Sequence, residues 1–207
     1  LISKDFKVRQ DAIDIVKRAM DRAAFMGAKV VNLWPGQDGY DYPLCQDYSR
    51  MYDTFMESVC IAADHNSDIF LAVESKMRDP RMRSLFATVA DVLLLSMESG
   101  RANIGVSIDV GHVFCAGGNA AQAIQACADR GKLFHIHTND NYSYWDDDMI
   151  AGSVRFAEYI EMCYTLRKVG YDGWCTVDIF PLREDSRGCV EESVSYMTIF
   201  DNIVEKI

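Results

Sequence analysis

Acidic and imidazole side chains end four apolar runs of this 207-residue sequence. Glu74 ends FLAVE, Asp109 lies in IGVSIDVGH, His137 ends KLFHIH and Asp178 lies in VDIF. Polar groups in apolar surroundings are rare unless they are paired or bind a metal. Three carboxylates and one imidazole suit Mn²⁺, Mg²⁺ or Co²⁺ better than a structural zinc, which would draw on cysteines. If the four residues meet, the sequence predicts a divalent-metal site.

The histidines near this set have two interpretations each. His112 follows Asp109 with D-x-x-H spacing, which lets both face one pocket, although a lone histidine is often structural. His135 and His137 are two residues apart on one predicted strand and therefore point to the same side. His137 is nearer the strand end and is the better candidate ligand. Asp146–Asp148 is ambiguous, and we expect at least two of its three acids to be solvated.

The elements that would position these residues alternate along the chain. Five apolar, β-branched runs read as parallel strands covered on both faces, because their apolar residues are successive rather than alternating. They lie at 29–34, 68–74, 103–110, 132–137 and 173–180. A helical pattern precedes each run and one follows the last, which predicts an α/β chain with a parallel sheet. The carboxyl ends of such strands carry the active site in a parallel barrel.

Helix boundaries and faces can be predicted from caps and spacing. Asp79-Pro80 is expected to open a helix over 81–99, and Asn119 to cap the next helix. Glycines expected to end helices are Gly27, Gly100, Gly131 and Gly170. The first helix is expected to bury Val8, Ile13, Val16, Met20, Ala23 and Ala24, and the last Val190, Val194, Met197 and Ile203.

Composition limits the classes of function. The formal net charge of −10 argues against a polyanionic partner such as nucleic acid. No apolar run approaches the roughly 18 residues of a membrane helix. The 7 cysteines are scattered without a C-x-x-C pair, which favours free thiols in a reducing cytoplasm. No phosphate loop or dinucleotide fingerprint is present. We expect one domain over residues 1–207.

Taken in order, the motifs resemble a known family. They are ESK…DPR (74–81), SIDVGH (107–112), HIHTNDN (135–141), WDDD…GSV (145–154) and DIFPLRED (178–185). This set is similar to the sugar phosphate isomerase/epimerase superfamily, the xylose isomerase-like TIM barrels. The resemblance implies a (β/α)8 barrel. Five of its eight β/α units, the C-terminal ones, would be present here, and the N-terminal strands would be missing.

The resemblance also implies roles for residues. Glu74, Asp109, His137 and Asp178 would hold the metal, with Mn²⁺ the expected ion. His112 would contact a substrate oxygen, and Glu74 and Asp178 would move the proton beside the carbonyl. In the 3-epimerases the last ligand is Glu, so the shorter Asp178 favours an isomerase-like variant. Further expected substrate contacts are Lys76, Trp34, Trp145 and Arg183.

The leading hypothesis is a metal-dependent isomerase or epimerase that acts on a sugar or sugar-like hydroxy-carbonyl compound through an enediolate. An alternative within the superfamily is a subunit that cleaves C-glycosides. Alternatives of other classes are an apurinic endonuclease-like phosphodiesterase, which the acidic charge disfavours, and a non-catalytic partner subunit, which the intact acids disfavour. We expect a small-molecule sugar as the partner, no nucleic acid or membrane, and a homo-oligomer.

Overall fold

The computed structural model describes residues 1–37, 40, 42, 44–79 and 83–207, and the chain divides into two compact units. The first comprises Leu1–Ser107 and the second Ile108–Ile207. The boundary falls inside a strand, β3 (Ile104–Asp109), so each unit contains part of it.

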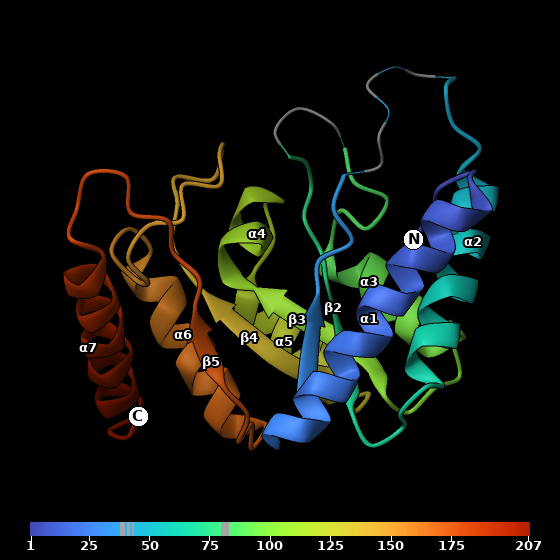
Figure 1. The fold of residues 1–207 in the computed structure, drawn as a ribbon. Coiled ribbons are helices and arrows are strands. Elements are labelled where there is room, and N and C mark those ends of the chain that lie inside the picture. Colours follow the sequence, from blue (N-terminus) through green and yellow to red (C-terminus); the bar gives the residue numbers. More distant parts are fainter. Residues whose placement is uncertain (38–39, 41, 43, 80–82) are drawn as a thin grey trace. The chain divides into compact units, whose positions relative to one another are not determined.

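The first unit alternates helices and strands (Figure 1). Its elements are α1 (Phe6–Met26), β1 (Val30–Leu33), α2 (Tyr48–Ala63), β2 (Phe70–Glu74), α3 (Val89–Glu98) and most of β3. α1 begins at Asp5, whose side chain accepts hydrogen bonds from two backbone N–H groups, and ends at Gly27 with φ 75°. Only glycine adopts that left-handed conformation without strain, which explains its place after the helix.

Strand pairing in this unit is parallel, as predicted. β1 pairs with β2 and β2 with β3, and the register places Glu74 opposite Ser107. β3 is buried throughout, and all of β2 except Phe70 is buried, whereas β1 is partly exposed. Phe55 of α2 and Phe86, which precedes α3, are both buried, and their ring centroids lie 4.6 Å apart. The register therefore brings the carboxyl ends of β2 and β3 to one edge.

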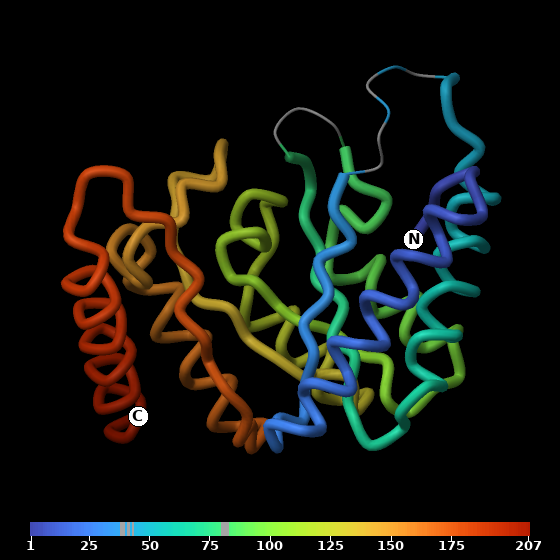
Figure 2. The backbone as a smooth tube through the Cα atoms, viewed as in Figure 1, coloured from blue at the N-terminus to red at the C-terminus, as the bar shows by residue number. Residues whose placement is uncertain are grey.

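The second unit continues the alternation. After the end of β3 it contains α4 (Val110–Cys115), α5 (Ala120–Ala128), β4 (Leu133–Thr138), α6 (Phe156–Lys168), β5 (Cys175–Val177) and α7 (Ser186–Val204). β4 and β5 are parallel, and α6 packs against both α5 and α7. Figure 2 shows the long connection that leaves β4 and returns to α6. This connection carries the NDNYSYWDDD sequence.

Two predictions about helices need correction. The helix predicted over 81–99 begins only at Val89, where Thr88 and Asp91 form a capping box. Pro80–Met82 lie outside the described residues, and residues 83–88 are not helical. The prediction also missed α4: Val110, assigned to a strand, is its first residue. The reason is that Asp109 ends β3 and at once caps α4, since its side chain accepts from the N–H of His112. The cap predicted at Asn119 is confirmed.

The predicted buried faces were partly wrong. Val8 and Ala24 of α1 are exposed, although the other four predicted residues are buried. None of the four residues predicted for α7 is fully buried. The buried residues of α7 are instead Cys189, Ser193, Phe200 and Val204. Ser193 is tolerated there because its hydroxyl donates to the Cys189 carbonyl and accepts from the N–H of Ala151. Phe200 packs its ring 5.6 Å from that of Tyr159.

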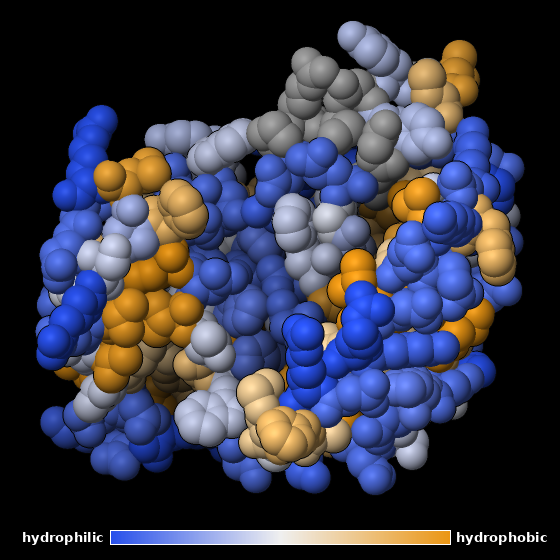
Figure 3. All heavy atoms as spheres, in the orientation of Figure 1, coloured by the Kyte–Doolittle hydropathy of each residue, from blue (hydrophilic) through white to orange (hydrophobic). Residues whose placement is uncertain are grey.

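An apolar groove marks the outer side of β5. Figure 3 shows apolar side chains gathered where α6, β5 and α7 lie. Its lining includes Cys163, Leu166, Cys175, Val194 and Met197. β5 pairs only with β4 among the described residues of this unit, which leaves Cys175 and Thr176 exposed. Residues 173–174 and 178–180, predicted as strand, lie outside β5.

Other expectations from composition can be compared with the structure. All 7 cysteines are free thiols, four of them buried. Burial raises the pKa of Cys127 and of Cys163 to about 12, so both remain protonated near neutral pH. Within the described residues, we find no helix with the length and apolar character needed to cross a bilayer.

The capping box predicts a measurable stability loss. Thr88→Ala removes the hydroxyl that accepts from Asp91 N, and should lower the free energy of unfolding by about 1 kcal/mol in urea titrations. Thr198→Ala is the matched control, because that exposed threonine lies inside α7 and alanine favours a helix interior. An equal decrease in the free energy of unfolding for the two variants would contradict the assignment of Thr88 as the cap of α3.

Candidate metal centre

Both oxygens of the Asp109 carboxylate accept hydrogen bonds. Asp109 ends β3 and its side chain is 0% exposed. Oδ1 accepts from the backbone N–H of His112 at 2.9 Å and from Asn139 Nδ2 at 3.0 Å. Oδ2 accepts from the same Asn139 nitrogen at 2.9 Å. A buried carboxylate held on both oxygens has little freedom to rotate, so its position is set before any ligand binds.

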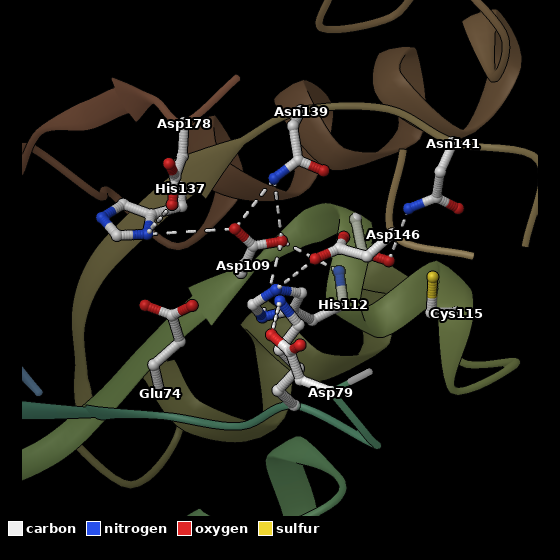
Figure 4. Close-up of polar contacts among 12 residues, drawn as sticks. Glu74, Asp79, Asp109, His112, Cys115, His137, Asn139, Asn141, Asp146 and Asp178 are labelled. Carbon is white, nitrogen blue, oxygen red and sulfur yellow. Dashed lines mark hydrogen bonds and ion pairs between the residues drawn. The ribbon is translucent and has the colours of Figure 1, made fainter. Parts of the chain in front are cut away.

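His137 and Asp178 lie beside Asp109 (Figure 4). His137 comes from β4, and its Nδ1 is 3.9 Å from Asp109 Oδ2 and 3.1 Å from Asp178 Oδ2. Asp178 follows β5 and is about half exposed, while His137 is nearly buried. Three predicted ligands from three successive strands thus point at one another in the second unit.

The donor atoms of these three residues fit a divalent cation. Each offers one ligand atom, and these atoms lie within 4.8 Å of one another. Ligands at about 2.0–2.3 Å from one ion lie roughly 3 to 4.6 Å apart, depending on the angle between them. Two carboxylate oxygens and one imidazole nitrogen are donors that Mn²⁺, Mg²⁺ and Zn²⁺ all accept. The geometry therefore fits a divalent metal ion.

His112 has a partner that the sequence did not predict. Its Nε2 lies 3.1 Å from Asp146 Oδ2, and its Nδ1 is 3.8 Å from Asp109 Oδ1. An acceptor beside Nε2 favours the tautomer that carries the proton there. All three acids of Asp146–Asp148 lie on the connection after β4 and are partly buried, so they are less exposed than a solvated loop would suggest. Hydrogen bonds hold these residues: the Asp147 carboxylate accepts from the N–H of Tyr142, and the backbone carbonyl of Asp148 accepts from the N–H of Phe180.

His135 occupies a different environment from His137. Its Nε2 is 3.0 Å from Thr176 Oγ1, and its ring lies edge-on to that of His137 with centroids 4.9 Å apart. The ring of His135 therefore packs against the side of the His137 ring.

The connection after β4 is fixed by a buried acid. The side chain of Asp140 accepts hydrogen bonds from the backbone N–H groups of Asn141, Val154 and Arg155 at 2.8–2.9 Å. Burial raises the pKa of Asp140, and these N–H groups oppose that rise. The side chain of Asn141 donates to the Gly111 carbonyl, and Cys115 Sγ donates to the Trp145 carbonyl. The connection is therefore bonded to α4 near both ends of that helix. The contacts of Asn141 and Cys115 were not predicted from the sequence, although an amide close after a strand end was a signal.

The first unit places its own predicted residues in one pocket. Glu74 is buried at the end of β2, and its Oε2 accepts from Asn32 Nδ2 at 2.6 Å. Trp34, Glu74 and Lys76 line the same pocket together with Phe55 and Phe86. The ammonium of Lys76 lies 5.2 Å from the Trp34 ring centroid and pairs with Asp79 at 3.1 Å.

The remaining predicted substrate residues are exposed in the second unit. Trp145 is 48% exposed on the connection after β4. Arg183 is exposed on the segment between β5 and α7. Both are accessible to a ligand, but neither is among the residues that hold Asp109 or His137.

Comparison with known proteins identifies the family. Residues 1–198 match the model of the xylose isomerase-like TIM barrel. The chain belongs to that family, and its five parallel strands with their helices are part of a (β/α)8 barrel, as predicted.

Individual proteins are similar to the chain in sequence or in fold. The chain is 31% identical over 193 residues to xylose isomerase of Thermus thermophilus, covering 90% of this chain and 50% of that protein. A D-tagatose 3-epimerase-like protein superposes with a TM-score of 0.80 at 24% identity, covering 99% of this chain and 74% of that one. A 3-keto-D-glucoside 4-epimerase from E. coli superposes with a TM-score of 0.79 at 17% identity, covering 96% of this chain and 74% of that one. The chain spans about half the length of the curated relatives it matches.

The two neighbouring histidines should differ in their effect on metal affinity. His137→Ala removes a donor and should abolish Mn²⁺ binding measured by titration calorimetry. His135→Ala removes only lateral support and should weaken binding about tenfold, as typical of groups that orient a ligand. The opposite order of effects would mean that His135, and not His137, supplies the ligand.

Proposed function

We propose that the chain belongs to a divalent-metal-dependent isomerase or epimerase that acts on a sugar or a sugar-like hydroxy-carbonyl compound. The observation that carries the proposal is the convergence of Asp109, His137 and Asp178 at successive strand ends, with ligand atoms within 4.8 Å of one another. Two carboxylates brought this close together repel each other, and a bound cation would relieve that repulsion.

Glu74 is proposed as the fourth ligand on the basis of strand register. It is paired with Ser107 across β2 and β3, and residues paired in register point to the same face of a sheet. Asp109 lies two residues beyond Ser107 on β3, and alternate residues of a strand also share a face. Mn²⁺ is the proposed ion, with Mg²⁺ and Co²⁺ as the other candidates.

The proposed chemistry assigns separate tasks to the side chains. A divalent cation held by these residues would supply Lewis-acid polarisation of a substrate carbonyl. Glu74, buried and already hydrogen-bonded to Asn32, would take the proton from the carbon beside that carbonyl. Asp178, half exposed, would return a proton. His112, whose Nε2 lies 3.1 Å from Asp146 Oδ2, would contact a substrate oxygen.

The substrate would be a polyhydroxylated carbonyl compound. The pocket beside Glu74 carries an aromatic ring, Trp34, and a cation, Lys76, which suit the apolar face and the oxygens of a sugar. Trp145 and Arg183 are proposed as further contacts. The similarity to xylose isomerase and the short Asp178 favour isomerisation over epimerisation.

A phosphodiesterase acting on nucleic acid is disfavoured by charge. The sequence carries 31 acidic against 21 basic residues, whereas neutralising phosphates needs an excess of Lys and Arg. The small sugar is therefore the proposed partner.

Exchange with solvent tests the proposed base. Glu74→Gln keeps the size of the side chain but removes the base, so it should leave the thermal unfolding temperature unchanged and lower the rate about 10² to 10⁴-fold. In D₂O, with a sugar that the wild type converts, the wild type should incorporate deuterium at the carbon beside the carbonyl, and Glu74→Gln should not. NMR of the product reports the label.

Glu192→Gln on the exposed face of α7 is the matched control, and it should retain full rate and exchange. Turnover of the wild type with the migrating hydrogen fully retained would contradict proton transfer by Glu74 and indicate a hydride shift instead.

A further inference from the structure

We infer that Asn139 is a positioning residue that presents one oxygen of Asp109 to the metal, and that position 111 is glycine to make room for it. The inference rests on the proposed metal centre and extends it to residues that do not themselves ligate. All of them belong to the second unit.

The two oxygens of Asp109 have different surroundings. Oδ1 caps α4 through the N–H of His112, which commits it to the helix. Oδ2 is the oxygen nearest His137 Nδ1, at 3.9 Å, and is therefore the one available to an ion. Asn139 Nδ2 donates to both oxygens and so fixes the plane of the carboxylate. A carboxylate oxygen has lone pairs for a donor and a cation together, so this contact does not block ligation.

Only one orientation of the Asn139 side-chain amide is energetically favourable. With Nδ2 toward Asp109, the buried Oδ1 has no conventional donor, and it faces the Cα of Gly111 instead. The flipped amide would set its oxygen against two carboxylate oxygens, which is repulsive. A Cα–H···O contact with Gly111 is a weak but favourable substitute for the missing donor.

Glycine at position 111 is explained by space and not by backbone conformation. The residue lies inside α4, where alanine is the better helix former. Its φ is not in the left-handed region, unlike that of Gly117. An added Cβ would overlap Asn139 Oδ1, and would lie 2.8 Å from Asn139 Cγ and 2.9 Å from Asn141 Nδ2. A side chain here would force Asn139 away from Asp109.

The backbone of Asn139 is held independently of its amide. The buried hydroxyl of Tyr159, from α6, donates to the Asn139 carbonyl at 2.5 Å. Replacing the Asn139 side chain therefore leaves this anchor in place, which allows positioning of Asp109 to be separated from folding of the connection.

The test measures Mn²⁺ dissociation constants by electron paramagnetic resonance on the full chain, with thermal unfolding of the metal-free protein in parallel. Asn139→Ala should raise the dissociation constant about 10- to 100-fold, the usual effect of removing a group that orients a ligand. Gly111→Ala should raise it similarly, although it deletes no polar group. Asn141→Ala is the matched control, because it loses an amide contact with Gly111 but none with Asp109, and it should bind Mn²⁺ as the wild type does.

The variant that combines Gly111→Ala with Asn139→Ala provides the most decisive result. If Gly111→Ala acts by displacing Asn139, it should add no further loss of affinity in the Asn139→Ala background. Additive losses, or Asn139→Ala binding Mn²⁺ with wild-type affinity, would overturn the inference. Should Gly111→Ala fail to fold, the comparison of Asn139→Ala with Asn141→Ala still decides it. A wild-type chain that binds no Mn²⁺ would instead overturn the proposed function on which the inference rests.

Discussion

The second unit depends on one carboxylate, that of Asp109, with three tasks. Asp109 ends β3 and begins α4, so the same side chain terminates a buried strand, caps a helix and offers an oxygen beside His137. A fully buried charge is costly unless several donors compensate it, and here a backbone N–H and the Asn139 amide do so. The cap fixes where α4 starts and hence where His112 lies. The amide fixes where the connection after β4 begins.

That connection shows how a loop can be as well determined as a strand. Asp140 accepts from three backbone N–H groups, and the carbonyls of Gly111 and Trp145 accept from Asn141 and from Cys115. Polar groups buried away from water are favourable only when they are paired, so these bonds select one path of the chain. Asp146 is thereby held beside the imidazole of His112.

Much of this could be predicted from the sequence, and the exceptions have physical causes. Continuous apolar runs identified all five strands, because strands covered on both faces lack alternation. The glycines after α1 and α6, Gly27 and Gly170, have positive φ as predicted. α4 could not be predicted, since its six residues carry no periodic pattern and its cap looks like a buried strand residue. The buried face of α7 was misjudged because Ser193 is inside and Val194 outside, and the Ser193 hydroxyl is satisfied there by the Cys189 carbonyl of its own helix and by the N–H of Ala151. Asp109, His137 and Asp178 were predicted together, whereas the supporting contacts of Asp146 depend on the path of a loop.

The most direct test of a metal centre on Asp109, His137 and Asp178 is to identify the nitrogen bound to the ion. Pulsed electron paramagnetic resonance of the Mn²⁺-loaded full chain, with ¹⁵N-labelled histidine, reports each directly coordinated imidazole nitrogen by its hyperfine coupling. The geometry predicts one such nitrogen, Nδ1 of His137, whose signal is lost in His137→Ala and kept in His112→Ala. A spectrum without coordinated imidazole, or one whose signal survives in His137→Ala, would contradict the account.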